Sequence, residues 1–274
     1  MYLVNGERSE SIDIADRGFQ YGDGLFETIE VLNGRPLFLE RHLKRLNHGC
    51  HRLLIPAPDQ ELLIAEAEQM SASTQRAVLK LIVTRGSGGR GYRQPAQLSP
   101  TRVFALYPFP DYPKQFHTDG VAVRLCKQRL GINQSLAGIK HLNRLEQILA
   151  RAEWQNEEIT EGIMLDHDNF VIEGTMSNVF LGKEGILYTP KLTNCGVAGI
   201  VRQMVIEFST QYEIPLLEQE IECSALWQAD EIFITNSILG ICPVRMIEQT
   251  HFSIGTQTKK LQAMFNALRI ELAS

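Results

Sequence analysis

The sequence lacks the features that mark a secreted, metal-binding or membrane-embedded chain. Its five cysteines are odd in number and widely spaced, with no C-x-x-C pair, which argues against a disulfide framework and a zinc site. No apolar run approaches the about 18 residues of a membrane span, and the N-terminus turns polar after "MYLV", unlike a signal peptide. The net charge of -5 leaves no basic footprint for nucleic acid or an anionic membrane. We therefore expect a soluble protein of the reducing cytoplasm.

The histidines also lack the neighbouring ligands that a metal site requires. His42, His48 and His51 fit one helix, but no carboxylate or cysteine at metal-ligand spacing completes a ligand set. His141 is interpreted as a helix cap, with the orientation of an active site as the alternative. We expect no metal.

What is present is an ordinary globular composition over a sizeable length. Apolar residues make up 44% and charged residues 22% of the 274 residues. A chain of this length can bury one large core or two modest ones. Three prolines within residues 108–113 mark an interdomain boundary. The expected organisation is a small domain over 1–110, a proline-rich linker over 111–118 and a larger domain over 119–274.

The first half predicts a hairpin followed by two helices. Asn33-Gly34 separates two strand-like runs, at 25–32 and 36–39, which is a strong β-hairpin signal. Helices are predicted over 39–54 and near 59–70, and further strands at 2–4, 77–85 and 101–109. The first helix has one apolar face, made of Leu39, Leu43, Leu46, Cys50 and Leu53.

The second half predicts strands and helices in alternation. Helices are expected over 141–157, from Gly199 onward, and over 257–272. Strands are expected at 120–126, 161–166, 169–174, 178–182, 186–190, 214–221 and 230–236. Together the two halves indicate an α/β (α+β) fold, with a smaller α+β domain first and a larger α/β domain second.

A glycine-rich loop, "TRGSGGRGY" over 84–92, follows a predicted strand with the spacing G-x-G-x-x-G. A dinucleotide-binding turn with that spacing needs a helix that starts inside the glycine run, but Pro95 and Pro100 block one. A P-loop is excluded because no Gly-Lys-Ser/Thr follows. The loop also carries Arg85, Arg90 and Tyr92, and such guanidinium and phenol groups suit a carboxylate ligand. A solvated surface loop is the alternative.

Lys140, in "LAGIKHLNRLEQ", lies just before a predicted helix. Small apolar neighbours and the positive end of that helix both disfavour its charged form. This environment suits a lysine that forms imines or moves protons, whereas an ordinary solvated lysine is the alternative. The helix would bury an apolar face made of Leu142, Leu145, Ile148, Leu149 and Ala152.

Three further segments carry groups that suit an anionic ligand or a proton. Glu173 ends a strand before a turn of small polar residues, and Gly199 opens a helix whose first N–H groups attract anions. Thr235 and Asn236 end another strand and offer hydroxyl and amide donors. Taken singly, these features also fit an edge carboxylate, a helix cap and a strand-end turn.

Taken together, the motifs resemble a known family. "YGDGLFETI" (21–29), "RHLKRL", "LAGIKHLNRLEQ", "EGTMSNVF" and "GIVRQ" are similar to the sequence blocks of the fold-type IV pyridoxal-phosphate enzymes, which include branched-chain and D-amino-acid aminotransferases. They occur in the family's order and span nearly the whole chain. The resemblance implies a two-domain fold with the cofactor between the domains. "RGSGGRGY" and "GIKHLNRLEQ" resemble a lyase of this family more than its aminotransferases.

The resemblance also implies roles for individual residues. Lys140 would hold pyridoxal 5'-phosphate covalently and move protons, and Glu173 would keep the pyridine nitrogen protonated. Arg45 matches the family's phosphate-binding arginine. Thr28, in "FETI", lies in a block near the family's active site and is a candidate catalytic residue. The remaining expected cofactor-binding residues are Gly199 and Ile200, through backbone N–H groups, and Ser177, Thr235 and Asn236.

The glycine-rich loop gains an expected role from the same resemblance. In related aminotransferases it carries an arginine and a histidine that bind the substrate carboxylate. Arg90 matches the arginine, whereas Tyr92 stands where the histidine would be, so the contacts differ. In the family this loop reaches the neighbouring subunit's site, which implies a homodimer.

Two other functions compete with a lyase. An aminotransferase acting on D-amino or branched-chain amino acids would share the fold. A cofactor-binding or regulatory protein without turnover would not require both Lys140 and Glu173.

Overall fold

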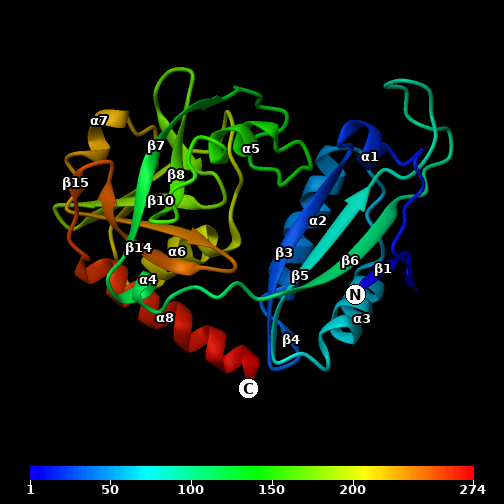
Figure 1. The fold of residues 1–274 in the computed structure, drawn as a ribbon, viewed down its shortest axis with the longest axis horizontal. Coiled ribbons are helices and arrows are strands. Elements are labelled where there is room, and N and C mark those ends of the chain that lie inside the picture. The colour runs from blue at the N-terminus through cyan, green and yellow to red at the C-terminus, as the bar shows by residue number, and fades with distance from the viewer. The chain divides into compact units, whose positions relative to one another are not determined.

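A computed structural model describes residues 1–274, and the chain divides into two compact units (Figure 1). Unit 1 consists of residues 1–110, 139–143 and 269–274, and unit 2 of residues 111–138 and 144–268. Two short segments from the second half of the sequence therefore belong to unit 1. The helix α4 (Gln115–Thr118) forms inside the segment expected to be a linker. The division into a domain, a linker and a second domain stays a prediction.

Unit 1 is built on a six-stranded antiparallel sheet with helices. The strand order is β2-β1-β6-β5-β3-β4. The strands are β1 (Tyr2–Val4), β2 (Glu7–Arg8), β3 (Gly24–Leu32), β4 (Arg35–Pro36), β5 (Arg76–Thr84) and β6 (Thr101–Pro108). The helices are α1 (Arg17–Tyr21), α2 (Leu39–Arg52) and α3 (Gln60–Ser71).

The local signals of the first half are confirmed. Asn33 and Gly34 have φ values of 52° and 78°, as a type I′ hairpin turn requires, and they join β3 to β4. Helix α2 buries Leu43, Leu46 and Cys50 in the core, with the two outer leucines of the predicted face packed against it. The strand predicted at 36–39 is shorter than expected, because the chain turns at 37–38 to begin α2.

Unit 2 is built on a nine-stranded mixed sheet. Its order is β12-β11-β10-β13-β14-β7-β8-β9, with β15 paired to β14. The strands are β7 (Val121–Leu130), β8 (Ile159–Asp166), β9 (Val171–Gly174), β10 (Asn178–Lys183), β11 (Ile186–Pro190), β12 (Leu216–Gln219), β13 (Glu231–Asn236), β14 (Gly240–Ile247) and β15 (Thr250–His251). The further helices are α5 (Leu145–Arg151), α6 (Ile200–Gln211), α7 (Cys223–Leu226) and α8 (Thr256–Ala273), whose last residues belong to unit 1.

The helix predicted over 141–157 is wrong in extent and in its buried face. Residues 139–143 are not helical and pair with β3 through an isolated bridge at His141, and α5 begins only at Leu145. Leu145, Ile148 and Leu149 are 71%, 60% and 57% exposed, whereas Gln147 and Ala150 are buried. An apolar helical stripe fits a protein core and a subunit surface equally well, so the pattern alone did not distinguish them.

The class predicted from the sequence, α/β (α+β), is confirmed by these two sheets and their helices. None of the helices has the length and apolarity that crossing a membrane requires.

All five cysteines are free thiols, and burial raises the pKa of Cys126 and Cys195 to about 12.

Candidate functional site

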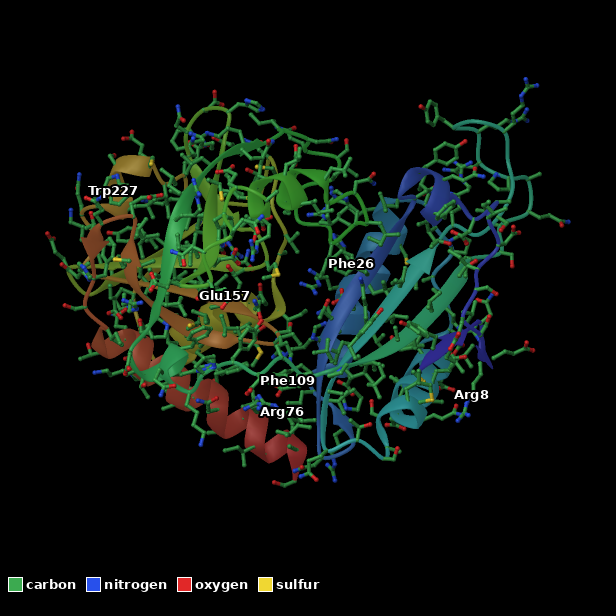
Figure 2. The ribbon with its side chains drawn as sticks, viewed as in Figure 1. Arg8, Phe26, Arg76, Phe109, Glu157 and Trp227 are labelled. Carbon is green, nitrogen blue, oxygen red and sulfur yellow. The ribbon has the colours of Figure 1, made fainter.

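Lys140 lies beside β3 in unit 1. The Phe26 N–H donates to the Lys140 carbonyl at 3.1 Å, and Leu142 N–H donates to Gly24 at 2.9 Å. The Lys140 ammonium lies 4.3 Å from the ring centroid of Phe26, a residue of β3 (Figure 2). Lys80 approaches the same ring at 5.2 Å. The expectation that Lys140 stands at a helix end is therefore wrong: a non-local strand pairing positions it.

Arg45 belongs to a buried ionic cluster between β3 and α2. Its Nε–H donates to Glu27 Oε1 at 2.8 Å, and its Nη2–H donates to Glu27 Oε2. His42 Nδ1 lies 2.6 Å from Glu27 Oε2. Burial opposes ionisation of Glu27, but the charge and hydrogen bonds of Arg45 and His42 outweigh it and lower the pKa of Glu27 to about 2. Burial lowers the pKa of His42 despite Glu27, so a neutral ring donates through Nδ1–H.

Thr28 follows Glu27 on β3 and takes the opposite face of the sheet. Because side chains alternate along a strand, Thr28 shares its face with Phe26, the ring that Lys140 approaches. Unit 1 thus brings Thr28 and Lys140 to one face of β3 and places Arg45 on the helix behind the other face.

In unit 2, Glu173 is a buried carboxylate at the end of β9. Its Oε2 accepts the Val197 N–H at 2.8 Å, and Gln147 Nε2 lies 3.5 Å from its Oε1. Burial lowers the pKa of Arg144, and this effect exceeds the rise caused by the negative charges of Glu173 and Glu146. Glu173 is therefore a buried carboxylate that accepts hydrogen bonds from amide donors and interacts with the charge of Arg144.

The N-terminus of α6 lies in the same part of unit 2. Gly199 is its N-cap, without a side-chain cap, and a Cβ there would approach Asn178 Oδ1 to 2.0 Å. Asn178 also donates to the Val197 carbonyl at 2.8 Å and pairs with Thr235 across β10 and β13. Thr235 is 1% exposed, yet its hydroxyl has no hydrogen-bond partner. Asn178 thus brings Thr235 near the first N–H groups of α6, which include that of Ile200.

Two other predicted cofactor-binding residues of unit 2, Ser177 and Asn236, use their side chains to shape turns. The Ser177 hydroxyl donates to Glu161 at 2.9 Å. Asn236 Oδ1 accepts the N–H groups of Ile238 and Leu239 at 2.9 and 2.7 Å. Cofactor contacts from Ser177 and Asn236 stay predictions.

Glu161 is a structural residue that sequence reasoning missed. This buried carboxylate accepts the backbone N–H groups of Thr175 and Met176, both at 3.0 Å, and the hydroxyls of Thr175 and Ser177. It therefore fixes the turn that follows Glu173. A charged residue before the apolar stretch "GIML" (162–165) was the available signal.

Arg85 does not serve the glycine-rich loop as a carboxylate ligand. It is buried and chelates Asp23 through Nε and Nη2, at 2.8 and 3.0 Å. Nη1 and Nη2 also donate to the carbonyls of Leu54 and Leu53, at 2.7 and 2.8 Å. The expectation for Arg85 is wrong, because its whole guanidinium is used to join segments of unit 1.

The loop itself is anchored by a second arginine and starts no helix. Arg17 Nη1 donates to the Gly91 carbonyl at 3.0 Å, and Gly86, at a φ of 86°, passes so close to Ser99 that a Cβ would lie 1.9 Å from its oxygen. Arg90 is exposed, and Tyr92 is 89% exposed with its ring edge against Tyr21. The loop therefore presents both predicted carboxylate-binding side chains to solvent.

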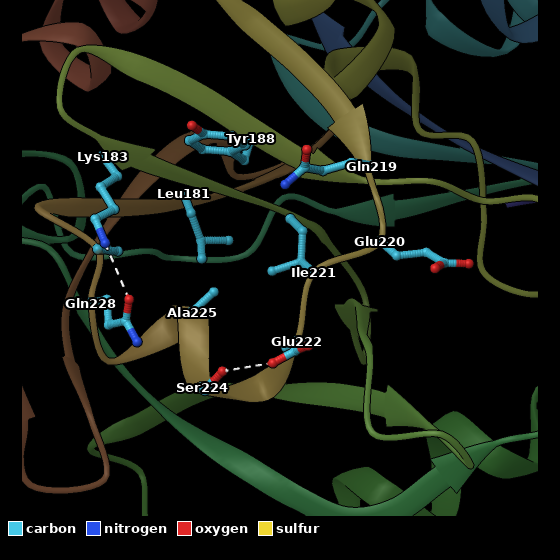
Figure 3. A pocket seen from close by; sticks show the side chains of 11 residues that line it. Leu181, Lys183, Tyr188, Gln219, Glu220, Ile221, Glu222, Ser224, Ala225 and Gln228 are labelled. Carbon is cyan, nitrogen blue, oxygen red and sulfur yellow. Dashed lines mark hydrogen bonds between the residues drawn. The ribbon is translucent and has the colours of Figure 1, made fainter.

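The donor set of these residues fits pyridoxal phosphate. A lysine amine and an arginine suit the aldehyde and the phosphate, and the buried Thr235 hydroxyl without a partner suits a phosphate oxygen. A pocket of about 460 Å³ in unit 2 contains none of these residues (Figure 3). Its polar groups include the pairs Lys183–Gln228 and Ser224–Glu222, which supply no catalytic set. No group of three or more metal-ligating side chains is present.

Comparisons with known proteins place the chain in a family. The family model described as amino-transferase class IV matches residues 24–247. Aminodeoxychorismate lyase of Vibrio harveyi is 35% identical over 97% of this chain and 100% of its own length. D-alanine aminotransferase of Bacillus licheniformis is 31% identical over 99% and 98%. The crystal structure of 4-amino-4-deoxychorismate lyase from Pseudomonas aeruginosa matches with a TM-score of 0.94 and 44% identity, covering 100% of both chains.

The chain therefore belongs to the class IV aminotransferase family of enzymes. Members of this family depend on pyridoxal phosphate. The resemblance stated from the sequence motifs is confirmed, as is the two-domain fold type that it implied.

Proposed function

We propose that the protein is a pyridoxal-phosphate-dependent lyase that converts 4-amino-4-deoxychorismate into 4-aminobenzoate and pyruvate, a step of folate biosynthesis. The observation that carries the proposal is the 44% identity and TM-score of 0.94 to a lyase of that name over the full length of both chains. The sequence relative with the same name also matches end to end.

Lys140 performs the proton transfers in this proposal. When bound, the cofactor withdraws electrons from the carbon that bears the substrate nitrogen. Lys140 would hold the cofactor through its side-chain amine, which would be free for proton transfer once the substrate is bound. Its free amine then accepts the proton from ring C4, while the C3–oxygen bond breaks and the ring becomes aromatic. Lys140 returns a proton to the enolpyruvyl carbon, which gives pyruvate.

The other residues bind and orient. Glu173 keeps the pyridine nitrogen protonated, and Arg45 binds the phosphate together with the N–H groups of Gly199 and Ile200. Thr28 assists Lys140 from the same face of β3. The remaining phosphate donors in this proposal are Thr235, Asn236 and Ser177.

Substrate binding and assembly complete the proposal. Arg90 and Tyr92 bind a substrate carboxylate, and the working form is a homodimer. The exposed apolar side chains of α5 support a subunit contact, because large exposed apolar surface is characteristic of interaction sites. The scattered free cysteines support a cytoplasmic location.

The test is the release of products from freshly prepared aminodeoxychorismate with purified protein and pyridoxal phosphate. The expected result is equal amounts of 4-aminobenzoate and pyruvate over many turnovers per site. Absence of both products from a protein that binds the cofactor would contradict the lyase assignment.

An aminotransferase is the second candidate, favoured by the 31% identity to D-alanine aminotransferase. It would pass an amino group to the cofactor. Conversion of the bound cofactor to its pyridoxamine form by D-alanine or branched-chain amino acids therefore distinguishes it from the lyase.

A further inference from the structure

Glu27 is a charged residue at a core position of unit 1. Strand alternation places it on the face of β3 that also carries Leu25 and Ile29, both in the apolar core. Its side chain is 1% exposed and faces α2. His42 and Arg45 meet it there because residues three apart in a helix share one face.

An ionic cluster at this position has no clear advantage for stability. Removing two charges from water is costly, and well-packed apolar residues of similar volume often stabilise a core as well or better. The neighbouring positions on both elements, Leu25, Ile29, Leu43 and Leu46, show that this interface packs apolar side chains. The interface nevertheless contains the three polar side chains of Glu27, His42 and Arg45, and we infer that they have a role other than packing.

The geometry of the cluster fixes the plane and direction of one guanidinium. Glu27 accepts from Nε and Nη2 of Arg45, one oxygen for each nitrogen, which locks two parallel hydrogen bonds in one plane. Because Nε and Nη2 form one edge of the guanidinium, Nη1 lies on the side away from the carboxylate. His42 donates from Nδ1 to Glu27 Oε2 at 2.6 Å, which prevents the carboxylate from rotating.

We propose that Glu27 and His42 are positioning residues that hold the Arg45 guanidinium in the orientation needed to bind the cofactor's phosphate ester. This inference rests on the proposed function, because that is where Arg45 receives its phosphate. Glu27 orients Arg45 directly, and His42 acts one step further away by fixing Glu27. Neither side chain contacts the cofactor.

The chain provides a matched control in the same unit. Glu66, on α3, chelates Arg102 of β6 through Nε and Nη2, at 2.8 and 2.7 Å. The exposed fractions of the two carboxylates are also similar, 1% for Glu27 and 7% for Glu66. Glu66→Gln therefore removes the carboxylate charge from an equivalent carboxylate–guanidinium pair without changing the contacts of Arg45.

The test compares the affinities of pyridoxal phosphate and pyridoxal, which lacks the phosphate, by titration of each purified protein without substrate. In Glu27→Gln we expect the Kd for pyridoxal phosphate to rise about tenfold or more, as is usual when a hydrogen bond to a charged group is lost. The Kd for pyridoxal should change less than about threefold, and Glu66→Gln should change neither value. His42→Leu should show a smaller loss of the same kind, and His42→Asn, which keeps a donor near Nδ1, should recover part of it.

Two results would overturn the proposal. One is an unchanged ratio of the two affinities in both Glu27→Gln and His42→Leu. The other is an equal change of that ratio in Glu66→Gln. If Glu27→Gln does not fold, His42→Leu alone decides between the two outcomes. Because no substrate is present, the answer does not depend on whether the lyase reaction is observed.

Discussion

The two units differ in the partners of most of their buried carboxylates. In unit 1 most of the partners are arginines, in the pairs Glu27–Arg45, Glu30–Arg269 and Glu66–Arg102, whereas Asp16 accepts from the Gly18 N–H and the Thr84 hydroxyl. In unit 2 most buried carboxylates accept hydrogen bonds from neutral N–H and O–H donors, as at Glu161, Asp166 and Glu231, whereas Glu173 accepts the Val197 N–H and also interacts with the charge of Arg144. A carboxylate chelated by arginine forms a nearly neutral pair, whereas one held by amides and hydroxyls keeps its negative charge.

This difference matches the division of labour that we propose. Unit 1 supplies Lys140, whose amine suits an aldehyde, and Arg45, whose guanidinium suits a phosphate. Unit 2 supplies Glu173, a buried carboxylate that suits a protonated ring nitrogen. The three predictions below test the comparison, from the largest expected effect to the smallest.

The largest effect should come from the lysine of unit 1 that approaches Phe26 most closely. Lys140→Ala should lower kcat about 10²–10⁴-fold, because the positioned proton-transfer group is lost. Lys80→Ala is the matched control, since its ammonium approaches the same ring at 5.2 Å, against 4.3 Å for Lys140. Steady-state release of 4-aminobenzoate measures both. Near-normal turnover by Lys140→Ala, or an equal loss in Lys80→Ala, would refute the assignment.

The second prediction compares the stability lost when a carboxylate held by neutral donors is replaced with the stability lost when one paired with a guanidinium is replaced. Glu161→Gln should lower the free energy of unfolding by about 3–5 kcal/mol, because an amide NH₂ would face N–H and O–H donors. Glu66→Gln should cost only about 1 kcal/mol, since its amide oxygen can still accept from Arg102, which is 18% exposed. Urea unfolding measures both costs, and equal costs would remove the distinction between the units.

The third prediction concerns the loss of stability in acid, and the direction of this pH dependence follows from the lowered pKa of Glu27. A pKa of about 2, against 4.5 when unperturbed, gives roughly 3 kcal/mol of stability above pH 4.5, which is lost as the pH falls through 2. The difference in unfolding free energy between the wild type and Glu27→Gln should therefore narrow by about 2 kcal/mol between pH 6 and pH 3. Urea titrations at both values measure it, and a constant difference would show that Glu27 titrates normally.

Local signals in the sequence predicted most of the fold. The turn at Asn33-Gly34, the apolar face of α2 and the start of α6 after Gly199 are encoded by residues close together in the chain. Strand β14 was not predicted, because Pro243 lies within it and proline is rare in central strands. There it pairs with Phe233 of β13, next to a shift in register on the other edge of the strand.

The candidate site was predicted from motifs, and its supporting contacts were not. The family resemblance gives Lys140, Arg45 and Glu173 as expected cofactor-binding residues, and these roles stay predictions. Glu27 and Glu161 were missed, since their meaning depends on partners from other elements that only folding brings together. Arg85 was misread for the same reason: its partners come from elsewhere in unit 1, and the sequence shows only a positive charge beside a loop.

The most direct test of the account is to identify the lysine that holds the cofactor. The protein would be incubated with pyridoxal phosphate, reduced with borohydride, digested and mapped by mass spectrometry. The account predicts a phosphopyridoxyl group on Lys140 in the wild type, and its loss from that peptide in Lys140→Ala. Modification of another lysine instead, such as Lys80, would contradict the account.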